Sequence, residues 1–161
     1  MKRDIGRLKT EDFDLLVIGG GINGCAIARD AALRGVKTAL IEKDDFACGA
    51  SGKTTKIIHG GIRYLEQLNL NLIYEALHER GILLRTTPHL VHPLEFIIPV
   101  YKGDPRPLIM MRTGVFIYDM LAGNSNIHCH RPLNKDELML LERDIASKGL
   151  KGGVLYCDAQ M

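Results

Sequence analysis

Two short apolar runs, with a helical stretch between them, dominate the N-terminal part of the chain. Residues 15–18 form an uninterrupted apolar run, which predicts a buried strand. An alanine-rich helical stretch follows and is closed by Gly35, and a second apolar run ends at Glu42. This order of strand, helix and strand predicts a βαβ unit with parallel strands.

The middle of the chain continues with helical and strand patterns. Helical spacing of apolar residues marks residues 65–85, which must end before Pro88, and residues 106–121, whose start is marked by Pro105 and Pro107. Residues 94–101 predict a strand, and Pro99 within it favours a place near a sheet edge.

The remaining segments complete a mixed pattern without internal repeats. Asn134 is suited to cap a helix that runs to Arg143, and residues 153–157 predict a final strand. Residues 44–55 are rich in small and hydroxyl side chains and predict a loop. The chain is therefore predicted to have an α/β fold.

A glycine motif occupies the turn between the first predicted strand and the first predicted helix. It reads Gly19-x-Gly21-x-x-Gly24. Gly19 permits the tight turn, Gly21 lets the backbone approach a pyrophosphate, and Gly24 lets the helix pack closely on the sheet. Free N–H groups at the start of the helix favour negative charge. The motif and its setting predict a dinucleotide-binding site.

Glu42 lies at the end of the second predicted strand. Its carboxylate can accept hydrogen bonds from a ribose diol there, and it would repel a 2′-phosphate. The pattern therefore favours FAD or NAD over NADP. The alternative is a glycine-rich turn that binds nothing. That alternative would not explain why the glycines, the helix, the strand and the acidic residue all occur in the order of a binding motif.

Composition is that of a soluble globular domain, with 46% apolar and 25% charged residues among 161. The 21 Lys and Arg nearly balance the 19 Asp and Glu, so no nucleic-acid partner is indicated. No apolar run approaches the roughly 18 residues of a spanning helix. Residues 1–12 form a polar N-terminal extension that lacks the apolar segment of a secretory signal.

Cysteine and histidine spacing predicts neither a disulfide framework nor a metal site. No C-x-x-C pair occurs, which favours reduced thiols in a cytosolic setting, and Cys25 is expected on the apolar face of the first helix. Adjacent side chains cannot easily converge on one ion, so His128-Cys129-His130 is not expected to hold a metal. The four cysteines are Cys25, Cys48, Cys129 and Cys157.

A second chemical pattern runs from Ser51 to Leu65. It reads SGKTTKIIHGGIRYL and combines hydroxyls, cations, a histidine and a Gly-Gly pair. Together with the glycine motif it resembles FAD-dependent glycerol-3-phosphate dehydrogenases. The pattern of that family at this place is Ser-Lys-Leu-Ile-His-Gly-Gly-Leu-Arg-Tyr-Leu, and residues 55–65 match it with only conservative changes. Residues 75–77, 88–90 and 114–119 are also similar to that family, so the resemblance covers nearly the whole chain.

The resemblance implies a Rossmann-like FAD/NAD(P)-binding domain of the glutathione-reductase type, with FAD as the cofactor. It implies that hydride leaves C2 of glycerol 3-phosphate for the flavin N5 and that electrons then pass to membrane quinone. A flavin suits these two steps because it can take a hydride and later release single electrons. The cofactor-binding positions that it implies are Gly19, Gly21, Ile22, Asn23 and Gly24 at the pyrophosphate, Glu42 at the adenosine ribose with Lys43 next to it, and Ser51, Thr55, Lys56 and His59 on the flavin side.

Two further positions are implied for the substrate, glycerol 3-phosphate. Arg63 suits bidentate capture of a phosphate because a guanidinium is planar and always charged, and Tyr64 would lie beside it. Purely structural roles remain as alternatives to these binding roles. Arg63 would then be a surface cation, His59 a loop residue and Tyr64 the start of a helix. The general base is expected beyond residue 161.

Members of the resembled family are much longer than this chain, which is therefore expected to be an N-terminal fragment, inactive alone. Residues 13–161 would be the first part of an incomplete FAD-binding domain, with the substrate domain largely beyond them. The resemblance implies a cytoplasmic enzyme, peripheral on the inner face of the membrane, and leaves a homodimer open.

Three rival functions are distinguished by specific features. A glycerol-3-phosphate oxidase would share the motifs but pass electrons to oxygen. An amine or amino-acid oxidase of the same flavin superfamily would not explain the close match of residues 55–65. A non-catalytic nucleotide-binding module, complete at this length, would bind adenine nucleotide without flavin colour.

Overall fold

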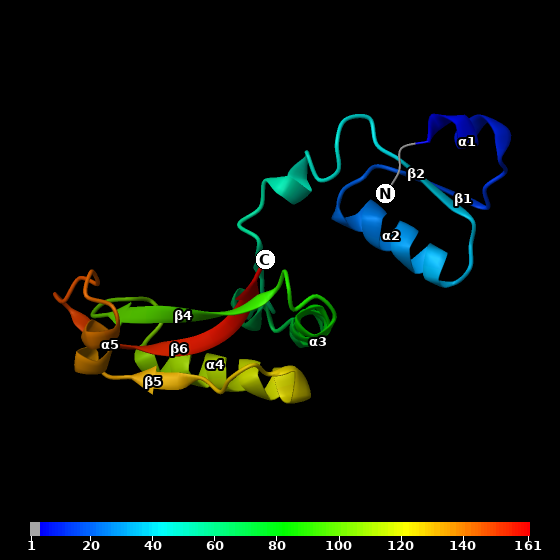
Figure 1. Ribbon diagram of the computed structural model, residues 1–161. Coiled ribbons are helices and arrows are strands. Elements are labelled where there is room, and N and C mark those ends of the chain that lie inside the picture. Colours follow the sequence, from blue (N-terminus) through cyan, green and yellow to red (C-terminus); the bar gives the residue numbers. More distant parts are fainter. Residues whose placement is uncertain (1–3) are drawn as a thin grey trace. The chain divides into compact units, whose positions relative to one another are not determined.

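The computed structural model describes residues 4–161, which form two compact units, one up to Thr55 and one of Lys56–Met161 (Figure 1). Residues 1–3, the start of the predicted polar extension, lie outside the described residues. The extension otherwise contains the short helix α1 (Ile5–Thr10), whose first turn is capped by the Asp4 carboxylate.

The first unit contains the predicted βαβ arrangement. Strands β1 (Leu15–Ile18) and β2 (Thr38–Ile41) pair in parallel, and α2 (Ile22–Leu33) connects them. Helix α2 ends as predicted at Gly35, whose φ of +80° allows a Schellman motif, with its N–H bonded to the Ala32 carbonyl. The small core of this unit consists of Val17, Ala31 and Ala39.

Much of the apolar surface of the first unit is exposed. Ile18 on β1 is 80% exposed and Leu33 on α2 is 70% exposed. Cys25, expected on the apolar face of the helix, is exposed as well, and its thiol contacts the Gly20 carbonyl. Helix α2 contacts β1 and β2, and Ala31 is its buried residue.

The second unit is built on an antiparallel sheet in the order β3-β6-β4, with β5 also paired to β6 (Figure 1). Its strands are β3 (Ile57–Ile58), β4 (His92–Tyr101), β5 (Arg131–Leu133) and β6 (Leu150–Gln160). The predicted edge position of the strand with Pro99 is confirmed, because β4 ends the sheet order. The final strand, β6, is longer than predicted at both ends.

Three helices accompany this sheet. They are α3 (Leu70–Thr86), α4 (Leu108–Ala122) and α5 (Lys135–Leu141), and α4 and α5 both contact β6. Asn134 caps α5 in a capping box with Glu137, as its position predicts, although the helix ends at Leu141. Short 3₁₀ turns occupy Ala50–Gly52, Ile62–Gln67 and Gly123–Ser125.

The predicted start of the helix at residue 65 is wrong. Residues 62–67 form a 3₁₀ turn instead, Leu68 adopts a left-handed conformation with φ +53°, and Asn69 caps a new helix at Leu70. The cap explains the break, because the Asn69 side chain accepts the Leu72 N–H and so sets a helix start. Tyr64 therefore belongs to the short turn that precedes α3.

Two apolar clusters hold the second unit together. One joins α3 and α4 through Ile73, Leu77, Tyr118 and Ala122, and Ile62 packs against it. The other joins β5, α5 and β6 through Leu133, Leu138 and Leu150. The first cluster lies directly beneath the turn that carries His59 and Arg63, so packing of α3 and α4 supports that turn.

Candidate cofactor and substrate sites

The turn after β1 has the close backbone packing that its glycines predict. Gly19 has φ +107°, a conformation that few other residues adopt. A Cβ at Gly24 would lie 1.9 Å from the Gly19 carbonyl oxygen, so only glycine fits where α2 begins. These two positions set the direction in which α2 leaves β1.

The N-terminus of α2 offers donors for an anion. Gly21 is the N-cap and provides no side-chain cap, while the Ile22 N–H donates to the Ser51 hydroxyl at 2.9 Å. The N–H groups of Asn23 and Gly24 lie in the first turn, where a helix supplies no acceptor. The first unit therefore presents backbone N–H groups and the helix dipole where a pyrophosphate is expected.

Ser51, which the resemblance implies on the flavin side, also contacts the glycine turn. Its hydroxyl lies at the start of α2, together with the residues predicted to bind the pyrophosphate. Since it accepts the Ile22 N–H, its own hydrogen can be donated to another group. Ser51 is thus suited to contact a phosphate oxygen.

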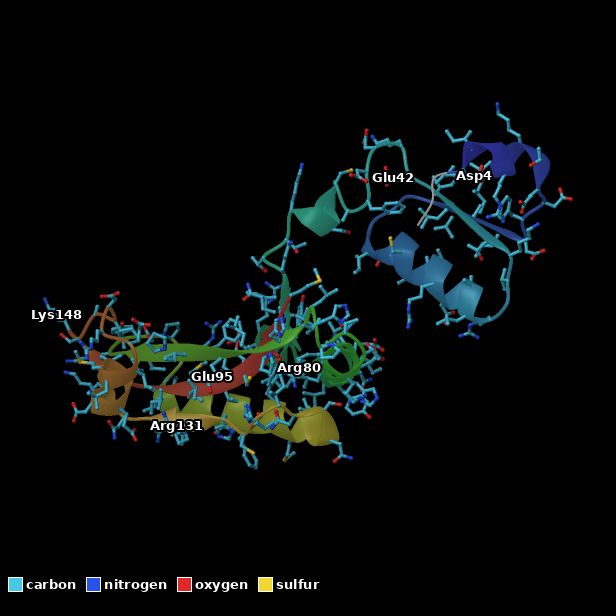
Figure 2. All side chains as sticks on the ribbon, in the orientation of Figure 1. Asp4, Glu42, Arg80, Glu95, Arg131 and Lys148 are labelled. Carbon is cyan, nitrogen blue, oxygen red and sulfur yellow. The ribbon has the colours of Figure 1, made fainter. Side chains whose placement is uncertain are left out.

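Glu42 lies next to the glycine turn and is fixed by two backbone donors (Figure 2). The Gly20 N–H donates to one carboxylate oxygen at 2.7 Å, and the Asp44 N–H donates to the other at 3.1 Å. The Gly20 bond, followed by the Asp44 bond, lowers the pKa of Glu42. The group is therefore held as an anion, and each oxygen retains capacity to accept from a ribose hydroxyl.

Lys43 and Thr55 are placed less specifically than Glu42. The Lys43 side chain is 89% exposed, and its ammonium lies 3.8 Å from the Asp44 carboxylate. Thr55 is exposed and ends the first unit. The structure thus groups Gly19, Gly21, Ile22, Asn23, Gly24, Glu42 and Ser51 around one turn, whereas Lys43 and Thr55 lie outside that group.

A cavity of about 260 Å³ in the second unit brings together two of the other predicted residues, His59 and Arg63. His59 and Arg63 line it from the turn before α3, and Phe96 and Tyr156 line it from β4 and β6 as a stacked aromatic pair with centroids 5.4 Å apart. The complete lining is Ile57, His59, Gly61, Ile62, Arg63, Phe96, Tyr156 and Asp158.

Arg63 and Tyr64 interact with each other at the edge of this cavity. The Arg63 guanidinium donates to the Tyr64 hydroxyl at 3.1 Å and lies 5.0 Å from the centre of the Tyr64 ring. Arg63 is exposed, so its remaining donors can reach a ligand. The stacking limits the orientations of the guanidinium, which favours capture of an anion in one geometry.

Lys56 begins the second unit with φ +58°, and its carbonyl accepts the Met161 N–H at 2.9 Å. That bond ties the segment leading to His59 to the end of β6. Lys56, His59, Arg63 and Tyr64 therefore belong to the second unit, while the other predicted cofactor-binding residues belong to the first.

Sequence reasoning missed a buried polar network beneath the cavity. Arg80 on α3 donates to the Asp158 carboxylate at 2.5 Å and to the carbonyls of Cys157 and Ser125 at 3.2 and 3.0 Å. The Tyr118 hydroxyl donates to the same carboxylate at 2.9 Å. Burial, with the nearby Asp158 charge, raises the pKa of Tyr118 far above its ordinary value, so the hydroxyl stays protonated.

One signal for this network is visible in the sequence. Arg80 lies three residues after Leu77 and seven after Ile73, which places it on the buried stripe of α3. A charged residue on such a stripe requires a buried partner. The partner, Asp158, could not be found in this way because it comes from a distant strand.

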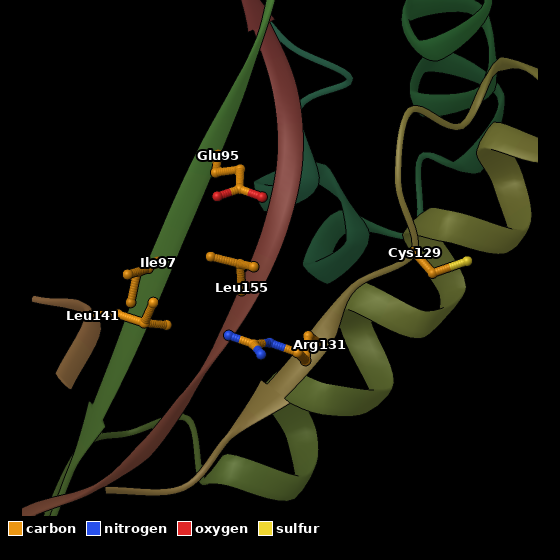
Figure 3. A pocket seen from close by; sticks show the side chains of 6 residues that line it. All are labelled: Glu95, Ile97, Cys129, Arg131, Leu141 and Leu155. Atoms are coloured by element: carbon orange, nitrogen blue, oxygen red, sulfur yellow. The ribbon is translucent and has the colours of Figure 1, made fainter. Parts of the chain in front are cut away.

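A larger hollow of about 510 Å³ lies elsewhere on the second unit (Figure 3). In this view Arg131 extends from β5 toward Leu155 on β6, and Glu95 lies on β4. None of the residues predicted to bind cofactor or substrate lines it. The lining is Glu95, Ile97, Cys129, Arg131, Leu141 and Leu155.

Potential metal ligands gather at one place in the described part of the chain, where ligand atoms of Glu42, Asp44 and Cys48 lie within 4.8 Å of one another. Both Glu42 oxygens already accept backbone N–H groups there. His130, from the trio at residues 128–130, instead contacts the Asp119 carboxylate at 2.7 Å and stacks edge-on with Phe116.

Comparison with known proteins places these observations in a family. The sequence of residues 14–161 matches the family described as FAD dependent oxidoreductase. The chain belongs to this family. The predicted cofactor, FAD, is confirmed by that membership. The glycine turn, with its tight contact at Gly24, fits the pyrophosphate of this cofactor.

Individual relatives of this family member confirm the predicted resemblance. A glycerol-3-phosphate dehydrogenase of Synechocystis sp. is 48% identical over 159 residues, which cover 99% of this chain and 29% of the relative. An alpha-glycerophosphate oxidase of Streptococcus pyogenes is 38% identical over 155 residues, covering 94% of this chain and 25% of the relative. The chain thus spans less than a third of these relatives.

Solved structures confirm the predicted FAD-binding α/β fold. A glycerol-3-phosphate dehydrogenase from Bacillus halodurans, complexed with FAD, has a TM-score of 0.68 and 29% identity, and the match covers 98% of this chain and 23% of that one. An L-proline dehydrogenase from P. horikoshii has a TM-score of 0.69 at 15% identity, covering 93% and 38%, and shares the fold. Among the described residues, no helix is long and apolar enough to cross a bilayer.

Replacing Glu42 with glutamine is expected to lower FAD affinity about tenfold, because the amide group would present a donor to Gly20 or Asp44 N–H. Flavin absorbance retained after desalting measures this, with exposed Asp12→Asn as the control. The folded-state pKa of Glu42 is lowered, so its ionised form stabilises the fold. This contribution to the free energy of unfolding is complete above the ordinary pKa of 4.5 and is lost as pH falls through the lowered pKa. Equal flavin retention in both variants would contradict the role.

Proposed function

We propose that this chain is the N-terminal part of an enzyme that oxidises sn-glycerol 3-phosphate to dihydroxyacetone phosphate with FAD and passes the electrons to quinone. The observation that carries the proposal is the cavity lined by His59 and Arg63, in a chain that is 48% identical over 159 residues to a glycerol-3-phosphate dehydrogenase. When bound, FAD supplies the two-electron acceptor.

Different residues of this chain would bind the cofactor and the substrate. The start of α2 and Ser51 provide donors for the pyrophosphate, and Glu42 provides acceptors for the adenosine ribose. Arg63 provides a planar, permanently charged donor for the substrate phosphate, held against the Tyr64 ring. His59 borders the same cavity and would face the flavin side.

The whole enzyme extends this assignment beyond the chain. We infer that residues 13–161 begin its FAD-binding domain and that the substrate domain and general base follow them. It would lie in the cytoplasm, peripheral on the inner face of the membrane where quinone is found, with a homodimer as the candidate assembly. The chain alone would be inactive because half of the substrate site is absent from it.

Removing the Arg63 guanidinium should raise the KM for glycerol 3-phosphate. Arg63→Ala in the whole enzyme is expected to raise KM about tenfold or more with little change in FAD content, because a charged donor is lost from the phosphate but not from the cofactor turn. Steady-state kinetics and flavin absorbance measure the two effects. Arg143→Ala, which removes another exposed arginine, is the control, and equal KM values would reassign Arg63 to a surface role.

The electron acceptor separates the proposed dehydrogenase from an oxidase. An oxidase is the second candidate because the chain is 38% identical to an alpha-glycerophosphate oxidase. We expect turnover of the whole enzyme to require a quinone analogue and to yield little peroxide. Undiminished turnover with oxygen alone, with stoichiometric peroxide, would favour the oxidase.

A further inference from the structure

The hydroxyl of Tyr118 connects the buried network to the turn that carries His59 and Arg63. It accepts the Gly60 N–H at 2.7 Å while donating to Asp158. The Gly60 N–H also lies 3.4 Å from the Asp158 carboxylate, a weaker second contact. One buried hydroxyl therefore links α4, β6 and the backbone of the turn.

Gly60 is packed directly on this hydroxyl. A Cβ at position 60 would lie 2.5 Å from the Tyr118 oxygen and 2.5 Å from Leu77. Gly61 then takes φ +73° and begins the 3₁₀ turn of Ile62–Gln67. The backbone between His59 and Arg63 is thus held at a buried point, although both side chains are exposed.

The buried pair of Arg80 and Asp158 fixes the position of the Tyr118 hydroxyl. Asp158 is 1% exposed and Arg80 is fully buried, and the charge pair between them holds the carboxylate that accepts from Tyr118. Phenylalanine could fill the apolar contacts of Tyr118 with Ile73, Leu77 and Ala122. The hydroxyl is therefore needed for the polar link to Gly60 rather than for filling the core.

We propose that Tyr118, oriented by Asp158 and Arg80, is a positioning residue that sets the backbone between His59 and Arg63 and so the direction of their side chains at the cavity. The placement of the turn follows from the contacts above, while its effect on substrate rests on the proposed function. Tyr118 does not line the cavity and acts through Gly60.

Hydrogen exchange tests the placement without any activity. In the whole, FAD-loaded protein, peptides within residues 57–65 are expected to retain a slowly exchanging amide at Gly60, and Tyr118→Phe is expected to speed its exchange about tenfold or more. Tyr74→Phe, which changes a tyrosine that is 54% exposed, is the control. Free exchange at Gly60 in the unaltered protein would overturn the proposal even if the variant failed to fold.

Kinetics then test the consequence for substrate. Tyr118→Phe is expected to raise the KM for glycerol 3-phosphate about fivefold, with FAD content unchanged and with less effect on kcat. A lower melting temperature with the same KM and the same Gly60 exchange would show a purely structural role and overturn the proposal. If the unaltered protein does not oxidise glycerol 3-phosphate, the proposed function fails, while the exchange result still decides whether Tyr118 positions the turn.

Discussion

Gly24→Ala is expected to lower FAD affinity of the whole protein by about 100-fold or more, on the order of 3 kcal/mol. The reason is steric, since the new methyl group would lie 1.9 Å from the Gly19 carbonyl oxygen, and backbone cannot yield as a flexible side chain can. Either α2 would shift away from β1 or the turn would open, and both displace the N–H groups of Asn23 and Gly24 from the pyrophosphate.

The matched control is Gly114→Ala, a second helical glycine. Its Cβ would meet only Leu65, at an ordinary distance of 3.8 Å, so that alanine should slightly stabilise α4. Titration of the apoprotein with FAD, followed by flavin fluorescence, measures both variants. Unchanged affinity in Gly24→Ala would mean that the close approach at Gly19 does not shape the cofactor site.

Local sequence patterns predicted the first unit well because its interactions are local. The glycine spacing, the Schellman end at Gly35 and Glu42 at the end of β2 all lie within one βαβ unit. The bond from the Gly20 N–H to Glu42 was not foreseen, since it depends on how the turn approaches the end of β2. The bond from the Ile22 N–H to the Ser51 hydroxyl was not foreseen either, because it spans 29 positions.

The second unit was harder to predict because its site depends on distant pairs. Residues 65–85 have a continuous apolar stripe, which hides the break at Leu68 and the cap at Asn69. Gly152 concealed the start of β6, because glycine is unfavourable in most strands, yet glycine is required there since a Cβ would lie 2.6 Å from the Leu133 carbonyl oxygen. Partners of Arg80 and Tyr118 could not be identified from periodicity, since Asp158 lies 78 and 40 positions away.

Arg80→Met is expected to destabilise the second unit by about 3–5 kcal/mol, because it leaves the buried Asp158 carboxylate without its cation. The carbonyls of Cys157 and Ser125 also lose their donor. Urea unfolding followed by tyrosine fluorescence measures this selectively. All five tyrosines lie in Lys56–Met161 and the chain has no tryptophan, so the signal comes from that unit alone.

An exposed ion pair in the same unit provides the control. Arg106→Met breaks the pair with Glu66, whose side chains are 53% and 41% exposed, and should destabilise the unit far less, because solvent screens exposed charges. Asp158→Leu combined with Arg80→Met removes both buried charges and should recover part of the loss, although Tyr118 then loses its acceptor. Equal destabilisation by Arg80→Met and Arg106→Met would show that burial of the Arg80–Asp158 pair adds nothing to the stability of the unit.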